Sequence, residues 1–487
     1  MDDSLQTSVR ARCAWIVLWI LNAAKANCEI GAKMKRPDIS RVVFNCTFII
    51  VAFVLTLYIG IYSGATNNII FDAYQTINQR IENALDVLSK NYSKKARIHS
   101  YFLQQSRYEG EGVTVNEASA NQEELILLAG FFEDSNELRL IQRDGTIVAR
   151  WPVKFSEIFH GMEDFGERPA SDLNVAIHGA LALPDGSIVF NFDRVGVVKI
   201  DRCGKVLWKL GGGAHHSVER AESGGFWVPG RKYYGTGSPS PFPPFSPPFA
   251  EDHIMKISDD GKIQKEMSVV KLFYENGLET LLTANGESFT PQRIWSQEIV
   301  HLNKIAELSS DVADDFPMFE AGDLALSFRK RNLVMVVDPE TQKIKWLKIG
   351  PWIRQHDPEF KAGGTIVLFN NNTYHTTFLD NNLKSPTNFP CTSNIIEINP
   401  ATGAYSIVYG NRKGQEMLSV IQGKLELAPG GGLLITEFEG GRVFETDSSG
   451  DIIWEYINRY DSDEVAEITE ARVYPAKYFN VSDWSCY

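Results

Sequence analysis

Histidines recur in the C-terminal part of the chain, each just ahead of a short apolar run. In chain order they are His178, the pair His215 and His216, His301, and His356. Imidazole titrates close to neutral pH, so several imidazoles meeting in one place would suit acid-base or covalent chemistry. A single histidine at the start of a strand is usually structural. Several that converge on one axis favour a functional site.

A repeat of β-hairpins predicts the elements that would position these histidines. One phrase consists of an apolar run, a polar turn and a second apolar run that often ends in Trp. Its copies are LRLIQRDGTIVARW, GVVKIDRCGKVLWKL, HIMKISDDGKIQKEM, LVMVVDPETQKIKWL, NIIEINPATGAYSIVY and RVFETDSSGDIIWEY. A second kind of hairpin, such as LALPDGSIVFNF, lies between them. Two hairpins make one four-stranded blade, and the spacing of roughly 50 to 60 residues is typical of propellers.

The predicted fold is therefore all-β, a six-bladed β-propeller over residues 131–478 with a short tail at 479–487. The innermost strand of each propeller blade lines the axial channel. A residue at the start of such a strand points into a funnel that all blades share. We therefore expect the pair His215 and His216, His301 and His356 to converge there, whereas His178 is assigned a structural role.

The chain from His178 to Tyr478 resembles the bacterial arylsulfate sulfotransferases, six-bladed propellers that move a sulfuryl group from an aryl sulfate to a phenol. The resemblance rests on HLN at 301–303, on ALSFRKRNLVMVVDPETQKIKWLKIG at 325–350, and on QHDPEF with GGTIVLFNNN at 355–372. It implies a nucleophilic histidine, matched by His356, beside a His-x-Asn pair, matched by His301 and Asn303.

The same resemblance implies an arginine that opens the next strand, matched by Arg329, and a catalytic histidine from the double-histidine blade, matched by His216. Arg331 is the alternative to Arg329, because the two would share one face if the strand already begins there. His215, the other histidine of that pair, is assigned to substrate binding. One departure is Leu425, which stands where the last blade would offer another histidine.

The chemistry implied is transfer without a soluble nucleotide cofactor such as PAPS. His356 would attack sulfur and form a sulfohistidine, which divides one hard transfer into two easier ones. Arg329 would hold the sulfuryl oxygens with its planar charged guanidinium, and His301 and Asn303 would add donors. His216 would protonate the departing phenolate and deprotonate the incoming phenol. The expected partners are an aryl sulfate donor and a phenolic acceptor, with no cofactor and no metal.

Two other functions stay open at this point. A propeller that keeps the fold as a non-catalytic binding or scaffold subunit of a membrane complex is the first, and hydrolysis of sulfate esters is the second. The formal charge of −13 and pI near 5.3 argue against a general nucleic-acid role, because such a surface repels a phosphate backbone.

The N-terminal part contains an uncharged apolar run, VVFNCTFIIVAFVLTLYIGIYS at 42–63. At about 1.5 Å per residue it is long enough to cross a hydrocarbon core of roughly 30 Å, so it predicts a transmembrane helix. Residues 1–41 would form a cytoplasmic tail with an interfacial segment at 13–24. Residues 64–130 would form a helical stalk or linker, because apolar residues from Ile70 to Leu88 follow helical spacing. Pairing of this stalk with another chain, giving a homo-oligomer, stays open.

Three of the six cysteines, Cys13, Cys28 and Cys46, lie on the cytoplasmic side of the predicted anchor or within it. Cys203, Cys391 and Cys486 follow it, and their pairing stays open. No CxxC or similar spacing indicates a zinc site, and no acidic loop has calcium-ligand spacing.

Basic residues predict the orientation of the anchor. Lys33, Lys35, Arg36 and Arg41 lie close before it, whereas Arg80 is the one cation in the twenty residues after it. We predict a single-pass protein of a bacterial inner membrane with a periplasmic propeller. Protease added to spheroplasts should digest the propeller and spare the N-terminal tail. Digestion of the tail with protection of the propeller would reverse this orientation.

Overall fold

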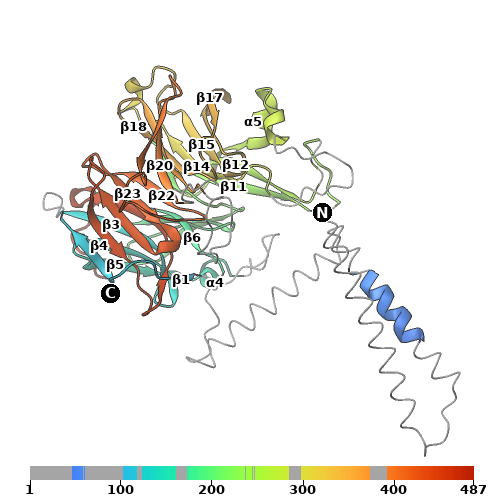
Figure 1. Cartoon of the computed structure of the whole chain (residues 1–487), viewed down its shortest axis with the longest axis horizontal. Helices are drawn as coiled ribbons and strands as arrows, with labels where there is room; N and C mark the ends of the chain where they lie inside the picture. Colours follow the sequence, from blue (N-terminus) through green and yellow to red (C-terminus); the bar gives the residue numbers. More distant parts are fainter. Residues whose placement is uncertain are drawn as a thin grey trace, which may run out of the picture. The chain divides into compact units, whose positions relative to one another are not determined.

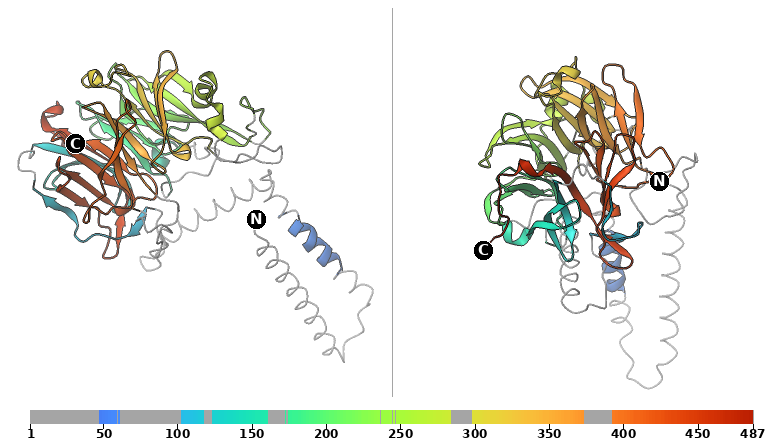
Figure 2. Two further views of the ribbon diagram at one scale, coloured as in Figure 1. Left: turned by 45° about the horizontal axis from the view of Figure 1, so that its top comes forward. Right: turned by 90° about the vertical axis from the view of Figure 1, so that its left-hand side faces the viewer.

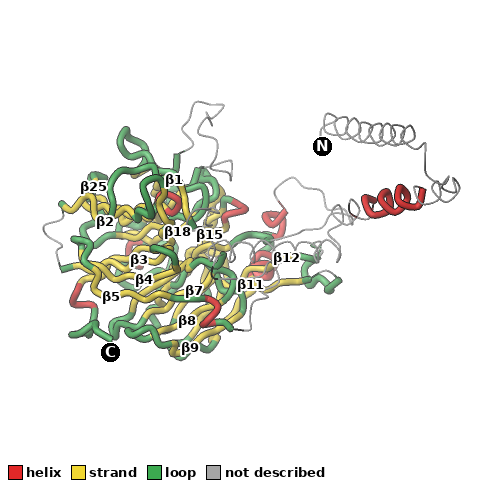
Figure 3. The backbone as a smooth tube through the Cα atoms, turned by 90° about the horizontal axis from the view of Figure 1, so that it is seen from below, coloured by secondary structure: helices red, strands yellow, loops and turns green. Residues whose placement is uncertain are grey.

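The computed structural model describes residues 47–58, 60, 102–117, 123–160, 172, 174–235, 237–243, 245, 247–283, 298–372 and 392–486. The chain falls into two units, 1–72 and 73–487, and the second contains every described β-strand. Strands are the main regular secondary structure in the described part of this unit, and its helices are short (Figure 3). The helices are α4 (Phe155–Ile158), α5 (Val269–Glu275) and the 3₁₀ turns η1 (Glu279–Thr283), η2 (Ala313–Asp315), η3 (Arg329–Arg331), η4 (Phe438–Gly440) and η5 (Ala476–Tyr478).

Six antiparallel sheets form the blades of the predicted propeller, so this prediction is confirmed (Figures 1 and 2). Blade 1 has the order β27 (Ile468–Pro475), β3 (Glu124–Phe132), β4 (Ser135–Gln142), β5 (Ile147–Pro152). Blade 2 contains β6 (Ile177–Ala182), β7 (Ile188–Phe192), β8 (Gly196–Ile200) and β9 (Val206–Gly211). Blade 3 contains β10 (Glu219–Arg220), β11 (Phe226–Tyr234), β12 (Phe249–Ile257) and β13 (Ile263–Ser268).

The other three blades follow in chain order. Blade 4 contains β14 (Leu302–Glu307), β15 (Leu324–Phe328), β16 (Leu333–Asp338) and β17 (Lys343–Ile349). Blade 5 contains β18 (His356–Lys361), β19 (Thr365–Asn370), β20 (Asn394–Ile398) and β21 (Tyr405–Tyr409). Blade 6 contains β22 (Lys424–Leu427), β23 (Leu433–Glu437), β24 (Arg442–Thr446), β25 (Ile452–Ile457) and, at its outer edge, β2 (Gly112–Asn116).

The two ends of the propeller meet in blade 1. The innermost strand β27 comes from the C-terminus and pairs with β3 from the N-terminal side, which closes the ring (Figure 1). A disulfide between Cys203 and Cys486 ties the C-terminal tail to the β8–β9 turn of blade 2. It answers the open question of cysteine pairing for these two residues, while Cys391 lies outside the described residues.

The predicted boundary of the propeller was wrong. The linker at 64–130 was expected to be helical, yet β1 (Leu103–Gln105) pairs with β26 (Glu464–Ala466), β2 joins blade 6, and β3 lies inside blade 1. The strands β1 and β2 were missed because their partners lie more than three hundred residues away in the sequence, whereas β3 pairs both with the distant β27 and with its neighbour β4. The periodic stretch from 70 to 88 lies outside the described residues.

The predicted transmembrane segment is described only in part. Residues 47–58 are helical, and the rest of 42–63, apart from residue 60, lies outside the described residues. No helix within the described part of the chain is long and apolar enough to span a membrane.

The hydrophobic core lies between neighbouring blades. One cluster joins blades 3 and 4 through residues such as Trp227, Ile254 and Leu326, and another joins blades 1 and 2 through residues such as Leu138 and Phe190. The innermost strands are buried along almost their whole length, as in β6, whereas the outermost strands such as β9 are largely exposed. Apolar residues on both faces of the middle strands therefore hold the blades around the axis.

Ion pairs fill the axis of the propeller below the histidines. The Lys304 ammonium lies 2.7 Å from Glu219, 3.1 Å from Asp357 and 2.6 Å from Glu359. Burial opposes the charge on Lys304, but Asp357 and Glu219 outweigh it and raise the lysine pKa well above its usual range. The inner strands of blades 3, 4 and 5 are thus joined by one buried cation.

We predict that Lys304→Met destabilises the propeller by about 3–5 kcal/mol, because Glu359 loses the cation beside it while Glu219 and Asp357 keep only Arg472 and Lys424. The midpoint of urea unfolding, followed by tryptophan fluorescence, measures this. Lys262→Met removes an exposed lysine in the β12–β13 turn and should change stability by less than about 0.5 kcal/mol. Equal midpoints for the two variants would contradict the role given to Lys304.

Candidate active site

The histidines lie at one end of the inner strands, where the backbone is irregular. His216 and His301 precede β10 and β14 with φ of 57° and 62°, in the left-handed region. His356 opens β18, and a bulge follows it between His356 and Glu359. Similar bulges occur near the start of β6 and β14. Bulges redirect side chains, and here they occur where the imidazoles leave the sheets.

Four of the predicted residues come together. The His301 Nε2 and His216 Nε2 atoms are 3.1 Å apart, and an Arg329 guanidinium nitrogen lies 3.5 Å from His301 Nε2. The ring centroids of His216 and His356 are 6.4 Å apart. His178 also joins them, with its ring 4.1 Å from that of His216 and its Nδ1 3.2 Å from Asp193. His178 was predicted to be structural, yet its ring lies against the cluster.

Asn371 fixes the orientation of the His356 ring. Its Oδ1 lies 2.6 Å from His356 Nδ1, and its Nδ2 donates to the carbonyls of Ser419 and Gln422, each at 2.8 Å. Because both Nδ2 contacts are carbonyls, Oδ1 must face the histidine as an acceptor. His356 Nδ1 also lies 3.0 Å from the Arg354 carbonyl, a second acceptor. The proton therefore sits on Nδ1, and Nε2 keeps a free lone pair.

Burial keeps the cluster neutral. It lowers the pKa of His356 well below the usual range, and the charge of Arg329 lowers it further. Burial and the neighbouring His178 lower the pKa of His216 in the same direction. Burial lowers the pKa of His301 to about 4 although Glu298 opposes this. Burial also lowers the pKa of Arg329 to about 10, so the guanidinium stays charged at neutral pH.

The two candidate arginines lie in a turn. Arg329 and Arg331 do not open a strand as expected but form the turn η3 after β15, because β15 ends at Phe328. Arg331 donates to the Ile299 carbonyl at 2.9 Å.

The predicted face of donors at His301 and Asn303 does not form, because His301 precedes β14 and the bulge between Leu302 and Lys304 interrupts the alternation. Asn303 instead donates to the Gln355 carbonyl at 2.9 Å. His215 is fully buried, 3.3 Å from Asp252.

Sequence reasoning missed Asn371, Asp252, Glu298 and Arg231. For Asn371 a signal existed, since the run Asn370-Asn371-Asn372 follows a buried strand at the end where the histidines lie. The other three gave no such signal, because Arg231 meets Asp252 across two strands of blade 3 and meets Glu298 far along the chain, just before blade 4.

One group within the described part of the chain has spacing that would suit a metal ion, namely His178, Asp193 and His216 with ligand atoms within 4.8 Å of one another. Both ring nitrogens of His216 are already engaged, Nδ1 by His215 at 2.6 Å and Nε2 by His301 at 3.1 Å. A metal ion requires a free lone pair on each ligand nitrogen, so we assign no metal to this group.

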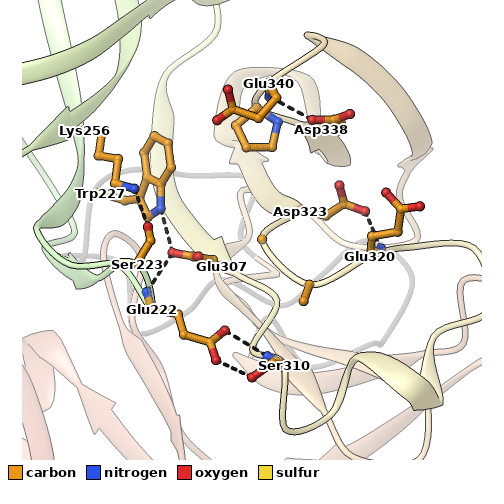
Figure 4. Close-up of a pocket in the computed structure, with 13 residues that line it drawn as sticks. Glu222, Ser223, Trp227, Lys256, Glu307, Ser310, Glu320, Asp323, Asp338 and Glu340 are labelled. Carbon is orange, nitrogen blue, oxygen red and sulfur yellow. Dashed lines mark hydrogen bonds between the residues drawn. The ribbon is translucent and has the colours of Figure 1, made fainter.

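A separate pocket of about 620 Å³ lies at the other end of the blades (Figure 4). It is lined by the turns that follow the inner strands β10 and β14 and by the β16–β17 turn, with Glu222 and Ser223 on one side and Asp338 and Glu340 on the other. Trp227 donates to Glu307 on its wall at 2.7 Å. The histidines precede the same strands, so this acidic pocket is distinct from the histidine cluster.

The fold and the site together define a class of protein: six-bladed propellers with histidines and an arginine at one end of the axis. The family model described as Arylsulfotransferase (ASST) matches residues 179–459, and the chain belongs to that family. No curated protein gives a match.

The solved structures that are similar to the chain share little sequence identity with it. One is a protein of unknown function from Bacteroides caccae, with 13% identity and a TM-score of 0.43, covering 72% of this chain and 98% of that one. Another is a catalytically inactive virginiamycin B lyase from Staphylococcus aureus with quinupristin, with 12% identity and a TM-score of 0.37, covering 76% and 98%.

The Asn371 contact predicts the tautomer of His356. Nitrogen NMR of histidine-labelled protein should show His356 protonated at Nδ1 and neutral well below pH 6.5, because burial disfavours the imidazolium. Asn371→Leu removes the side-chain acceptor and should shift the signal towards a mixture of tautomers. An unchanged Nδ1–H signal in this variant would show that the Arg354 carbonyl alone suffices.

Proposed function

We propose that the chain is a membrane-anchored arylsulfate sulfotransferase that works without PAPS, by way of a sulfohistidine at His356. The observation that carries this proposal is the convergence of His216, His301 and Arg329 on His356, whose Nε2 lone pair is left free by Asn371. A neutral buried imidazole in this tautomer is the form required of a nucleophile.

In the first half of the reaction, His356 Nε2 attacks sulfur and the bond from sulfur to the aryl oxygen breaks. The electron pair leaves with the aryl oxygen, and a proton that His216 and His301 take up from solvent when the anionic substrate binds passes to that oxygen and gives a neutral phenol. Arg329 stabilises the sulfuryl oxygens through its charged N–H groups. In the second half, a phenol loses its proton to the same histidines and takes the sulfuryl group from His356.

The propeller is proposed to face an oxidising compartment outside the cytoplasm. The disulfide between Cys203 and Cys486 supports this, since such bonds persist in oxidising compartments. The cation asymmetry around 42–63 gives the same orientation. A reaction that uses aryl sulfates in place of a nucleotide donor suits that location.

The mechanism predicts that His356→Ala abolishes the covalent intermediate and nearly all transfer. Intact mass of the purified full chain, after exposure to 4-nitrophenyl sulfate, should show one added sulfuryl group in the wild type and none in the variant. Arg329→Lys keeps the charge but loses the planar donor pair, and should slow transfer about 10²-fold.

His253→Gln is the matched control, because His253 lies on β12 between Glu251 and Glu266 and away from the cluster. It should leave transfer unchanged. Wild-type transfer by His356→Ala would refute the nucleophile. If the wild type turns over no aryl sulfate, the scaffold function replaces the proposal, and release of free sulfate without an acceptor would indicate hydrolysis.

A further inference from the structure

A closed ring of polar side chains surrounds His216, and the chemistry proposed above does not use all of it. The His215 and His216 Nδ1 atoms are 2.6 Å apart, and His216 Nε2 is 3.1 Å from His301 Nε2. His301 Nδ1 then contacts Glu298, and His215 Nε2 lies 3.3 Å from Asp252. Arg231 completes the ring, at 2.9 Å from Glu298 and 3.1 Å from Asp252.

The number of protons in this ring decides its net charge. Four links join the two carboxylates through three imidazoles, and each link needs one proton between two atoms that carry lone pairs. Both carboxylates stay ionised: Arg231 and His215 lower the pKa of Asp252, and His301 and Arg231 lower that of Glu298, in each case against burial. Three imidazoles supply three protons when each of them is neutral. One link is therefore left without a proton when the histidines are neutral.

We propose that the ring of Arg231, Asp252, His215, His216, His301 and Glu298 takes up one proton from solvent when an anionic sulfate group binds beside Arg329. This inference rests on the proposed function and extends it to Arg231, Asp252 and Glu298 as positioning residues. With three protons the ring carries one net negative charge, from one arginine and two carboxylates. With four protons it is neutral, so an anion and a proton favour each other's binding.

The fourth proton has a place in the reaction. When His356 displaces the aryl oxygen from sulfur, that oxygen receives the electron pair, and the proton passes to it from the link between the two Nε2 atoms. The ring returns to three protons and the phenol leaves neutral. The acceptor phenol gives its proton to the ring before it attacks, and release of the new ester returns that proton to solvent.

Other charged groups around the ring bias the same equilibrium. Glu298 also contacts Arg194 at 3.2 Å and Lys330 at 3.7 Å, and Arg329 stands beside His301. The imidazoles of His178 and His356 flank His216. The three cations and the surrounding burial oppose a fourth proton in the empty site. Burial likewise lowers the pKa values of His216 and His301.

Calorimetry of anion binding tests the proposal. Inorganic sulfate is the probe, and its binding to the full chain is measured at pH 8 in HEPES and in Tris, which differ in ionisation enthalpy. The wild type should take up about one proton per sulfate, and its affinity should fall about tenfold for each pH unit from 7 to 9.

Glu298→Gln and Asp252→Asn are the informative variants. The new amide donates its own hydrogen to the terminal imidazole, so three imidazole protons suffice for the other three links. Each variant should bind sulfate with about zero proton uptake and with an affinity that no longer depends on pH over this range. Asp193→Asn changes a carboxylate beside the ring that is not part of it, and should keep the uptake of one proton.

The outcomes separate this inference from the proposed function. Sulfate binding without proton uptake by the wild type, or unchanged uptake in both amide variants, overturns the proton-storing ring and leaves covalent transfer intact. Absence of sulfate binding also overturns it. The mass gain on His356 decides the proposed function independently, because it does not depend on the proton count.

Discussion

Burial of several imidazoles at one end of the propeller axis is the constraint on which the rest of the site depends. An imidazole removed from water resists protonation, so it is held as a neutral base with one N–H and one lone pair. Each ring must then find a donor for one nitrogen and an acceptor for the other within the protein. The contacts of Asn371, Glu298 and Asp252 meet this demand, and they also decide which nitrogen faces the funnel.

The propeller makes the cluster rigid because its members come from different blades. His215 and His216 come from blade 3, His301 and Arg329 from blade 4, and His356 with Asn371 from blade 5. Below them, Lys304 ties the inner strands of the same three blades through Glu219, Asp357 and Glu359. A change in the position of one blade would therefore disturb both the ionic layer and the histidines above it. Preorganisation of this kind is worth more on strands than on loops.

The blades and the convergence of the histidines could be predicted from the sequence, since both follow from local patterns. Hairpin turns and alternating apolar residues specify each sheet, and the position of His356 before an inner strand specifies its end of the channel. The parts that could not be predicted depend on contacts between residues that lie far apart in the sequence. Nothing near Asp252 or Glu298 in the sequence indicates a partner in another blade. The strands β1 and β2 were hidden in the same way, because β26 and β25 lie at the far end of the chain.

Blade 6 shows how a missing residue type is compensated by backbone. Leu425 stands where another histidine was sought, and it is buried in the apolar cluster between blades 5 and 6. The segment that leads into this blade instead supplies the Ser419 and Gln422 carbonyls that accept from Asn371. Those carbonyls turn Asn371 so that its oxygen faces His356 and leaves the lone pair on Nε2. Blade 6 therefore acts on the site through the orientation of His356.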